Sequence, residues 1–205
     1  MLFDAIVKLW KTCDSTGLYS KGTIVIVPIT YGSSREKLAL GTIEALARAV
    51  YLWERSDREA YIAYGMPTNC YQGSASIEHR MKLAYLKSLG VFENKLIFGE
   101  ECANSITEAK AVQKLITTAA LEPRTCIVVC TQLHSRSVRY IWKRLFPRCD
   151  VRIVCLQGHP DVEKGHQILT QRSKWLWLFA NFARHAALKT LGMERIEKIS
   201  HPHAR

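Results

Sequence analysis

The chain has 205 residues, of which 48% are hydrophobic and 23% charged, and this balance excludes a disordered or collagen-like protein. A chain of this length can bury a core without metal ions or disulfides, so we expect one domain over 1–205, with its core at about 23–156 and a C-terminal helical extension at 165–192. The sequence lacks a membrane-spanning apolar run and the pattern of a signal peptide, which predicts a cytoplasmic protein.

The net charge of +11 is concentrated in the C-terminal third. Residues 1–133 carry 15 basic and 13 acidic side chains, a net of +2, whereas residues 134–205 carry 14 and 5, a net of +9. Such a segment attracts nucleic acid, acidic lipid surfaces or phosphorylated ligands, although a solvated surface has the same composition. The arginines are dispersed and no nucleic-acid motif is present, so the sequence argues against nucleic-acid binding.

The seven cysteines show no CxxC spacing. Cys126 and Cys130 lie four apart in an apolar run, where a strand would hold them more than about 10 Å apart, too far for a disulfide. We therefore predict buried, reduced thiols, with neither disulfides nor a metal site.

Five short apolar runs rich in β-branched residues alternate with helical patterns. The predicted strands are 23–29, 60–64, 95–99, 126–131 and 151–156. The predicted helices between them are 36–55, 76–89, 105–120 and 135–145. Because continuous apolar runs are typical of parallel strands that are covered on both faces, the pattern predicts an α/β fold with a doubly wound, mainly parallel five-stranded sheet.

A further helix is predicted at 173–191, ending at Gly192. Its apolar residues are suited to packing on the sheet or on a second subunit. Its basic, amphipathic character is also suited to a membrane surface. The sequence leaves these alternatives open, and with them the oligomeric state.

In a doubly wound sheet, ligands bind beyond the carboxyl ends of the strands, so the residues that follow each strand are candidates. Tyr31, Gly32 and Ser33 follow the first strand and would let backbone approach an anion. Gly65 follows the second and begins a polar segment that leads to Glu78 in the next helix. Ordinary turns and the helix dipole explain these residues equally well.

The stretch after the third strand is the richest in polar residues. Glu101, Asn104, Ser105, Thr107 and Glu108 lie at or before the start of a helix. Asn104 or Ser105 can cap this helix, and Ser105 with Glu108 matches a capping box, which carries no chemistry. The carboxylates gathered here are also suited to bind a ribose, an amino group or a cation.

The fourth strand is followed by Thr131, His134 and Arg136, at another helix start. His134 is suited to act as an acid or base near neutral pH, and Arg136 to hold an anion. Cations at a helix N-terminus oppose the dipole, so their position calls for a ligand or an acidic partner such as Glu78 or Glu108. A structural histidine–glutamate pair is the alternative.

The ordered series of these motifs resembles the bacterial YdcF/SanA-like domain family, long catalogued as a domain of unknown function. The similar segments are Asn-Ser-Ile-Thr-Glu-Ala at 104–109, Thr-Gln-Leu-His-Ser-Arg-Ser at 131–137, and the helix pattern at 76–91. The resemblance covers about 23–156 and implies a Rossmann-like three-layer sandwich with a nucleotide-type ligand, for which S-adenosylmethionine has been proposed. The glycine-rich turns of the family are altered here, and the membrane anchor of many relatives is not expected.

We therefore expect a protein that binds a nucleotide-like or phosphate-bearing small molecule, with S-adenosylmethionine open as the ligand and catalysis undecided. His134 and Glu108 are the candidate catalytic residues. The candidate ligand-binding residues are Tyr31, Gly32, Ser33, Gly65, Glu78, Glu101, Asn104, Ser105, Thr107, Thr131 and Arg136. The alternative is a non-catalytic interaction protein that uses the basic C-terminal third at an envelope or polyanion surface, with peripheral membrane contact.

Overall fold

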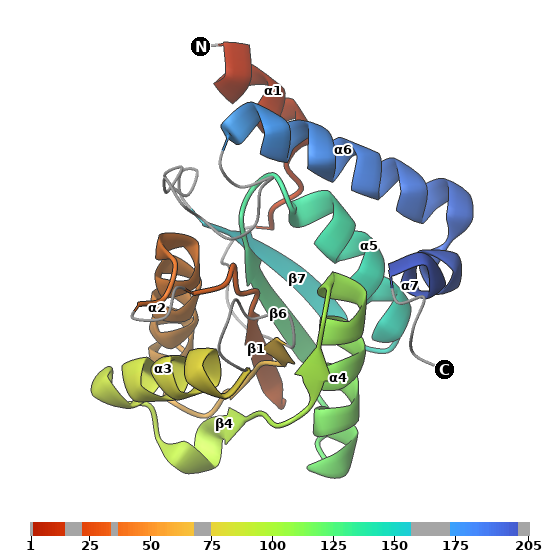
Figure 1. Cartoon of the computed structure of the whole chain (residues 1–205). Helices are drawn as coiled ribbons and strands as arrows, with labels where there is room; N and C mark the ends of the chain where they lie inside the picture. The colour runs from red at the N-terminus through yellow and green to blue at the C-terminus, as the bar shows by residue number, and fades with distance from the viewer. Residues whose placement is uncertain (1, 15–21, 34–36, 68–74, 157–172, 201–205) are drawn as a thin grey trace.

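A five-stranded, all-parallel sheet forms the middle layer of the protein (Figure 1). The computed structural model describes residues 2–14, 22–33, 37–67, 75–156 and 173–200. The strand order is β4 (Leu96–Ile97), β2 (Tyr61–Ala63), β1 (Ile24–Pro28), β6 (Thr125–Cys130) and β7 (Asp150–Cys155). Every residue of β1 and β6 is buried, which accounts for the continuous apolar runs of the sequence.

Helices cover both faces of this sheet, as Figure 1 shows. On one side lie α2 (Leu40–Glu54) and α3 (Ala75–Ser88), and on the other α4 (Ser105–Thr118) and α5 (Ser135–Leu145). The chain is thus a Rossmann-like three-layer α/β sandwich, as expected. Asn104 caps α4, because its side chain accepts hydrogen bonds from the backbone of Ile106 and Thr107. The capping box therefore joins Asn104 to Thr107, and the box suggested by the sequence for Ser105 and Glu108 was wrong by one residue.

The direction in which strands are added reverses between β1 and β6. At such a switch point the loops leave neighbouring strands in opposite directions and open a binding position at the carboxyl edge. Here hydrogen bonds join the loop after β1 to the loop after β6. The Thr131 backbone N–H donates to the Tyr31 hydroxyl oxygen at 2.8 Å, and that hydroxyl donates to Thr131 Oγ1 at 3.3 Å.

Several elements have no counterpart in the predictions from sequence. An N-terminal helix, α1 (Leu2–Trp10), lies beside α6 (Lys174–Leu191), and α7 (Met193–Ser200) follows. A 3-10 turn η1 (Glu93–Lys95) precedes β4, and β3 (Met66–Pro67) pairs with β5 (Glu101–Cys102) in a small parallel sheet. Helix α6 is the predicted C-terminal helix, and residues 165–172 of the predicted extension lie outside the described residues.

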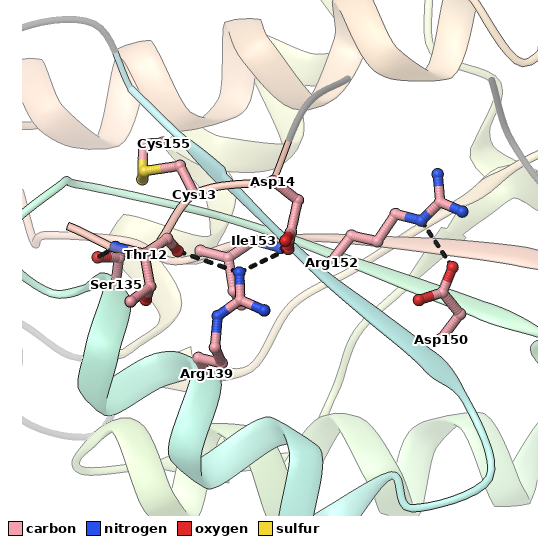
Figure 2. Close-up of polar contacts among 9 residues, drawn as sticks. All are labelled: Thr12, Cys13, Asp14, Ser135, Arg139, Asp150, Arg152, Ile153 and Cys155. Carbon is pink, nitrogen blue, oxygen red and sulfur yellow. Dashed lines mark hydrogen bonds and ion pairs between the residues drawn. A yellow bond between two sulfur atoms is a disulfide. The ribbon is translucent and has the colours of Figure 1, made fainter. Parts of the chain in front are cut away.

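The prediction that the cysteines are reduced is wrong for one pair, since a disulfide joins Cys13 to Cys155 (Figure 2). These residues are 142 positions apart, and no local pattern could have indicated that they meet. The prediction is confirmed for Cys126 and Cys130, which are free and fully buried on β6. Cys70 lies outside the described residues.

Among the described helices, none is both long enough and apolar enough to cross a bilayer.

Candidate functional site

Polar side chains from four separate segments meet at the switch point between β1 and β6. Ser105 begins α4, His134 precedes α5, and Arg184 lies on α6. Ser105 Oγ is 3.1 Å from His134 Nε2, and Arg184 Nη1 is 3.2 Å from the same nitrogen. We name these three residues, together with Tyr31 and Thr131, the switch-point cluster. The motifs that follow the third and fourth predicted strands therefore meet at one end of the sheet.

His134 is a neutral hydrogen-bond acceptor in this cluster. Burial, together with the nearby charge of Arg184, lowers the pKa of its imidazole from 6.5 to about 3. An arginine can only donate, so the contact with Arg184 assigns the lone pair to Nε2 and the ring proton to Nδ1. Nδ1 is buried and has no hydrogen-bond partner among the described residues. The Ser105 hydroxyl is therefore placed to donate to a neutral base.

Arg184 brings a positive charge to this cluster. Within the described residues, no carboxylate forms a salt bridge with it. The N-termini of α4 and α5 add partial positive charge close to His134. The positive charge gathered around His134 therefore favours the binding of an anion.

A second group of charged side chains lies at the carboxyl end of β1, and we name it the buried ion cluster. Lys82 is fully buried on α3 and forms an ion pair of 2.6 Å with Glu78, one helical turn earlier. Lys82 Nζ also donates to Thr30 Oγ1 at 3.0 Å. The Glu108 carboxyl, on α4, is close enough to both charges to be affected by them and receives a hydrogen bond from the Thr30 backbone.

The two clusters are neighbours. Glu108 lies one turn after Ser105 on α4, and Thr30 directly precedes Tyr31. Burial raises the pKa of Glu108 to about 7 against the opposing effect of the Lys82 charge, while Glu78 raises it further. Glu108 therefore changes its charge near neutral pH, which is the property expected of a general acid or base.

Arg136 is not part of either cluster in the structure. Its Nε donates to the Trp10 carbonyl and its Nη2 to the Leu9 carbonyl, the latter at 3.0 Å. These carbonyls are at the C-terminus of α1, where a cation stabilises the helix dipole. The candidate anion-binding arginine thus holds the N-terminal helix, and binding a ligand would require it to give up these contacts.

The segment after α1 crosses the carboxyl edge beside β7, and we name residues 10–14 the N-terminal strap (Figure 2). The Thr12 backbone N–H donates to Ser135 Oγ at 3.0 Å, and Arg139 pairs with Asp14 at 2.7 Å. Asp14 Oδ2 also accepts from the Ile153 backbone at 2.7 Å. These contacts and the Cys13–Cys155 disulfide attach the strap to α5 and β7.

Other predicted site residues have structural roles. Asn104 and Thr107 use their side chains in the cap of α4. Glu101 is exposed on β5, in the small second sheet. A Cβ at Gly65 would lie 2.7 Å from Cys102 Sγ, so a close backbone approach requires glycine there.

The remaining two residues form the turn after β1. Gly32 has a φ of 90° and Ser33 forms an isolated bridge with Leu38, so both shape this turn.

Three residues of the clusters were not predicted: Thr30, Lys82 and Arg184. Lys82 had a signal in the sequence, because Glu78, Lys82 and Leu86 occupy one stripe of α3 at intervals of four, and Leu86 is fully buried. Ionic residues on the buried stripe of a helix indicate a buried pair. Arg184 had no such signal, because α6 meets the sheet only in the tertiary structure.

In comparisons with known proteins, no family model, no curated protein and no solved structure matched the chain. Within the described residues, no group of three His, Cys, Asp or Glu side chains could hold a metal ion.

Proposed function

We propose that the chain binds a phosphate-bearing or nucleotide-like small molecule at the switch-point cluster. The observation that carries this proposal is the Arg184 guanidinium, which lies against a neutral imidazole and forms no salt bridge with a carboxylate of the described residues. Two helix N-termini face the same place. A phosphate would place a negative charge beside this partly exposed guanidinium and accept a hydrogen bond from it.

The same residues support proton transfer on a bound substrate. Neutral His134 accepts from a hydroxyl at Nε2, and Glu108 exchanges its proton near pH 7. An anion that pairs with Arg184 would offset part of the charge that depresses the pKa of His134, so ligand binding would make the imidazole more basic. Similarity to the YdcF/SanA-like family, which the sequence suggests, makes S-adenosylmethionine one of the ligands to test.

Isothermal titration calorimetry with AMP, adenosine, inorganic phosphate and S-adenosylmethionine tests the proposal. We expect AMP to bind and adenosine to bind far more weakly. Arg184→Gln should weaken AMP binding by about 1.5–3 kcal/mol, the contribution of a hydrogen bond to a charged group. Lys189→Gln, on the same helix but over the ring of Tyr140, is the matched control and should bind normally.

Equal affinity for AMP and adenosine would contradict a phosphate site. Wild-type affinity in Arg184→Gln would show that AMP binds somewhere other than the switch-point cluster. His134→Ala separates binding from chemistry. For an acid or base we expect lost turnover with modest change in affinity, whereas for a structural residue only the melting temperature should fall.

The disulfide argues against the cytoplasmic location that the sequence predicts. Disulfides persist mainly in oxidising compartments, and Cys13 and Cys155 are joined. Alkylation of free thiols in freshly lysed cells, followed by mass spectrometry, would show which state the pair has where the protein resides.

A further inference from the structure

Helices α1 and α6 run side by side in the same direction at one edge of the molecule (Figure 1). The rings of Phe3 and Trp175 are 5.1 Å apart, and seven residues further along both helices the rings of Trp10 and Phe182 are 4.1 Å apart. These contacts join the helices along the length of α1, so that the pair forms one continuous surface.

This surface is apolar on its outer side. The inward residues Phe3, Val7, Trp177 and Leu178 are buried. By contrast, Leu9 is 81% exposed and Phe179 is 60% exposed. We name the outward apolar side chains the two-helix face, and they are Leu2, Leu9, Trp175, Leu176 and Phe179. Five large apolar side chains left in water on two adjacent helices indicate a surface that is covered by something else.

Positive charge surrounds the two-helix face. Lys8, Lys11 and Lys174 are exposed, and Lys174 Nζ lies 5.0 Å from the centre of the Phe3 ring. Helix α6 contains no Asp or Glu at all. Asp4 is the acidic residue of α1, and it lies close enough to Lys174 for the two charges to interact. The face is therefore apolar at its centre and basic at its rim.

We propose that the two-helix face lies on the surface of an anionic membrane. An amphipathic helix that carries lysines beside Trp, Phe and Leu is suited to the boundary between headgroups and acyl chains, where the lysines reach anionic lipid and the indole sits at the interface. This binding is peripheral, since the helices lie along the surface. It is a property separate from the small-molecule site, which faces the carboxyl edge of the sheet.

The protein holds this face in place through the N-terminal strap. Arg136 binds the last carbonyls of α1, Trp10 Nε1 donates to the Leu133 carbonyl at 2.8 Å, and the disulfide fixes Cys13 to the end of β7. Because α1 is already held beside α6, membrane binding does not have to order it, and an intact strap favours binding.

Sedimentation with vesicles tests the proposal. The full chain is mixed with vesicles of phosphatidylcholine alone and with vesicles that also contain phosphatidylglycerol. We expect binding to the anionic vesicles, weakened by salt, and little binding to the neutral ones. The variant Lys8→Gln/Lys11→Gln/Lys174→Gln should lose affinity by about fivefold for each lysine replaced.

The apolar contribution is tested with Leu176→Ser/Phe179→Ser, which should weaken binding by at least about tenfold. The matched control is Leu89→Ser, an exposed leucine directly after α3, a helix that lies away from α1 and α6 in Figure 1. Circular dichroism checks that each variant is folded. Brominated lipids should quench the tryptophan fluorescence of the wild type, and Trp175→Phe should remove most of that quenching.

Two results would overturn the proposal. One is equal sedimentation with neutral and anionic vesicles, or none with either. The other is a wild-type dimer, seen by light scattering, that Leu176→Ser/Phe179→Ser converts to a monomer while vesicles do not bind. In that case, the face would be an interface between copies of the chain.

Discussion

The two halves of the carboxyl edge use charged residues in opposite ways. Beside β1, Lys82 and Glu108 are buried together with Glu78, and the cluster that they form adjoins the proposed ligand site. Beside β6 and β7, Arg136 and Arg139 bind carbonyls of the N-terminal strap, and Arg139 also pairs with Asp14. In the sequence, Glu78, Glu108 and Arg136 all lie near the start of a helix that follows a strand.

The difference shows that the position of a charged residue after a strand does not determine its role. What matters is whether another segment crosses the same part of the edge. The strap supplies carbonyl oxygens and a carboxylate to the arginines of α5, so their charges are held by contacts within the protein. Arg184, which reaches the edge from α6, meets a neutral histidine instead.

The largest effect should come from Lys82, because both it and its partner Glu78 are buried. Lys82→Met removes the cation that lies 2.6 Å from the buried Glu78 carboxylate, and breaking a buried pair typically costs about 3–5 kcal/mol. Urea denaturation measures the loss. The double variant Glu78→Gln/Lys82→Met should recover much of it, and a failure to recover would mean that packing, rather than charge, causes the loss.

The strap should contribute the next largest effect. Cys13→Ser/Cys155→Ser removes a crosslink that spans most of the chain, and we expect the free energy of unfolding to fall by about 2–4 kcal/mol. The midpoint of urea unfolding, with and without reductant, measures this. Reductant should destabilise the wild type and leave the variant unchanged. Equal sensitivity of both proteins would show that the disulfide does not form in solution.

Glu108 should make stability depend on pH. Its pKa in the folded protein is about 7, above its ordinary value of 4.5, so the folded state holds a proton that the unfolded state releases. This contribution to stability is complete below about pH 4.5 and is lost as the pH rises through 7. Glu108→Gln keeps a neutral side chain, so it should gain about 2–3 kcal/mol over the wild type between these limits.

The measurement has to isolate Glu108, because His134 changes the pH dependence of stability in the opposite direction. The pKa of His134 is lowered on folding, so its contribution is present above about pH 6.5 and is lost as the pH falls toward 3. The difference in unfolding free energy between Glu108→Gln and wild type, followed across pH, cancels the histidine. A flat difference would contradict the raised pKa.

The smallest effect is expected from Arg139. Its pair with Asp14 is partly exposed, with 24% and 34% of the two side chains accessible, and such pairs contribute about 1 kcal/mol or less. Arg139→Met, compared with Lys82→Met in the same denaturation series, tests the contrast between the two halves of the edge directly. A loss as large as that for Lys82 would mean that the strap is as essential to folding as the buried ion cluster.

The sequence by itself determined the regular architecture. The apolar runs at 24–28 and 125–130 are short, β-branched and continuous, because strands covered on both faces have no polar side. The helices of the sandwich follow from periodicity, and the local pattern limited the cap of α4 to Asn104 or Ser105, of which the structure uses Asn104. The meeting of His134 with the start of α4 also follows, since both come directly after parallel strands.

Only the tertiary structure decided which charged residues stay available for a ligand. Arg136 looked like an anion clamp, but it meets carbonyls 126 and 127 positions away in the chain. Cys13 meets Cys155, and Arg184 reaches His134, through packing that no local pattern encodes. The periodicity of apolar residues shows which side of a segment packs on the core. These contacts depend instead on where a segment that is distant in the chain crosses the edge of the sheet.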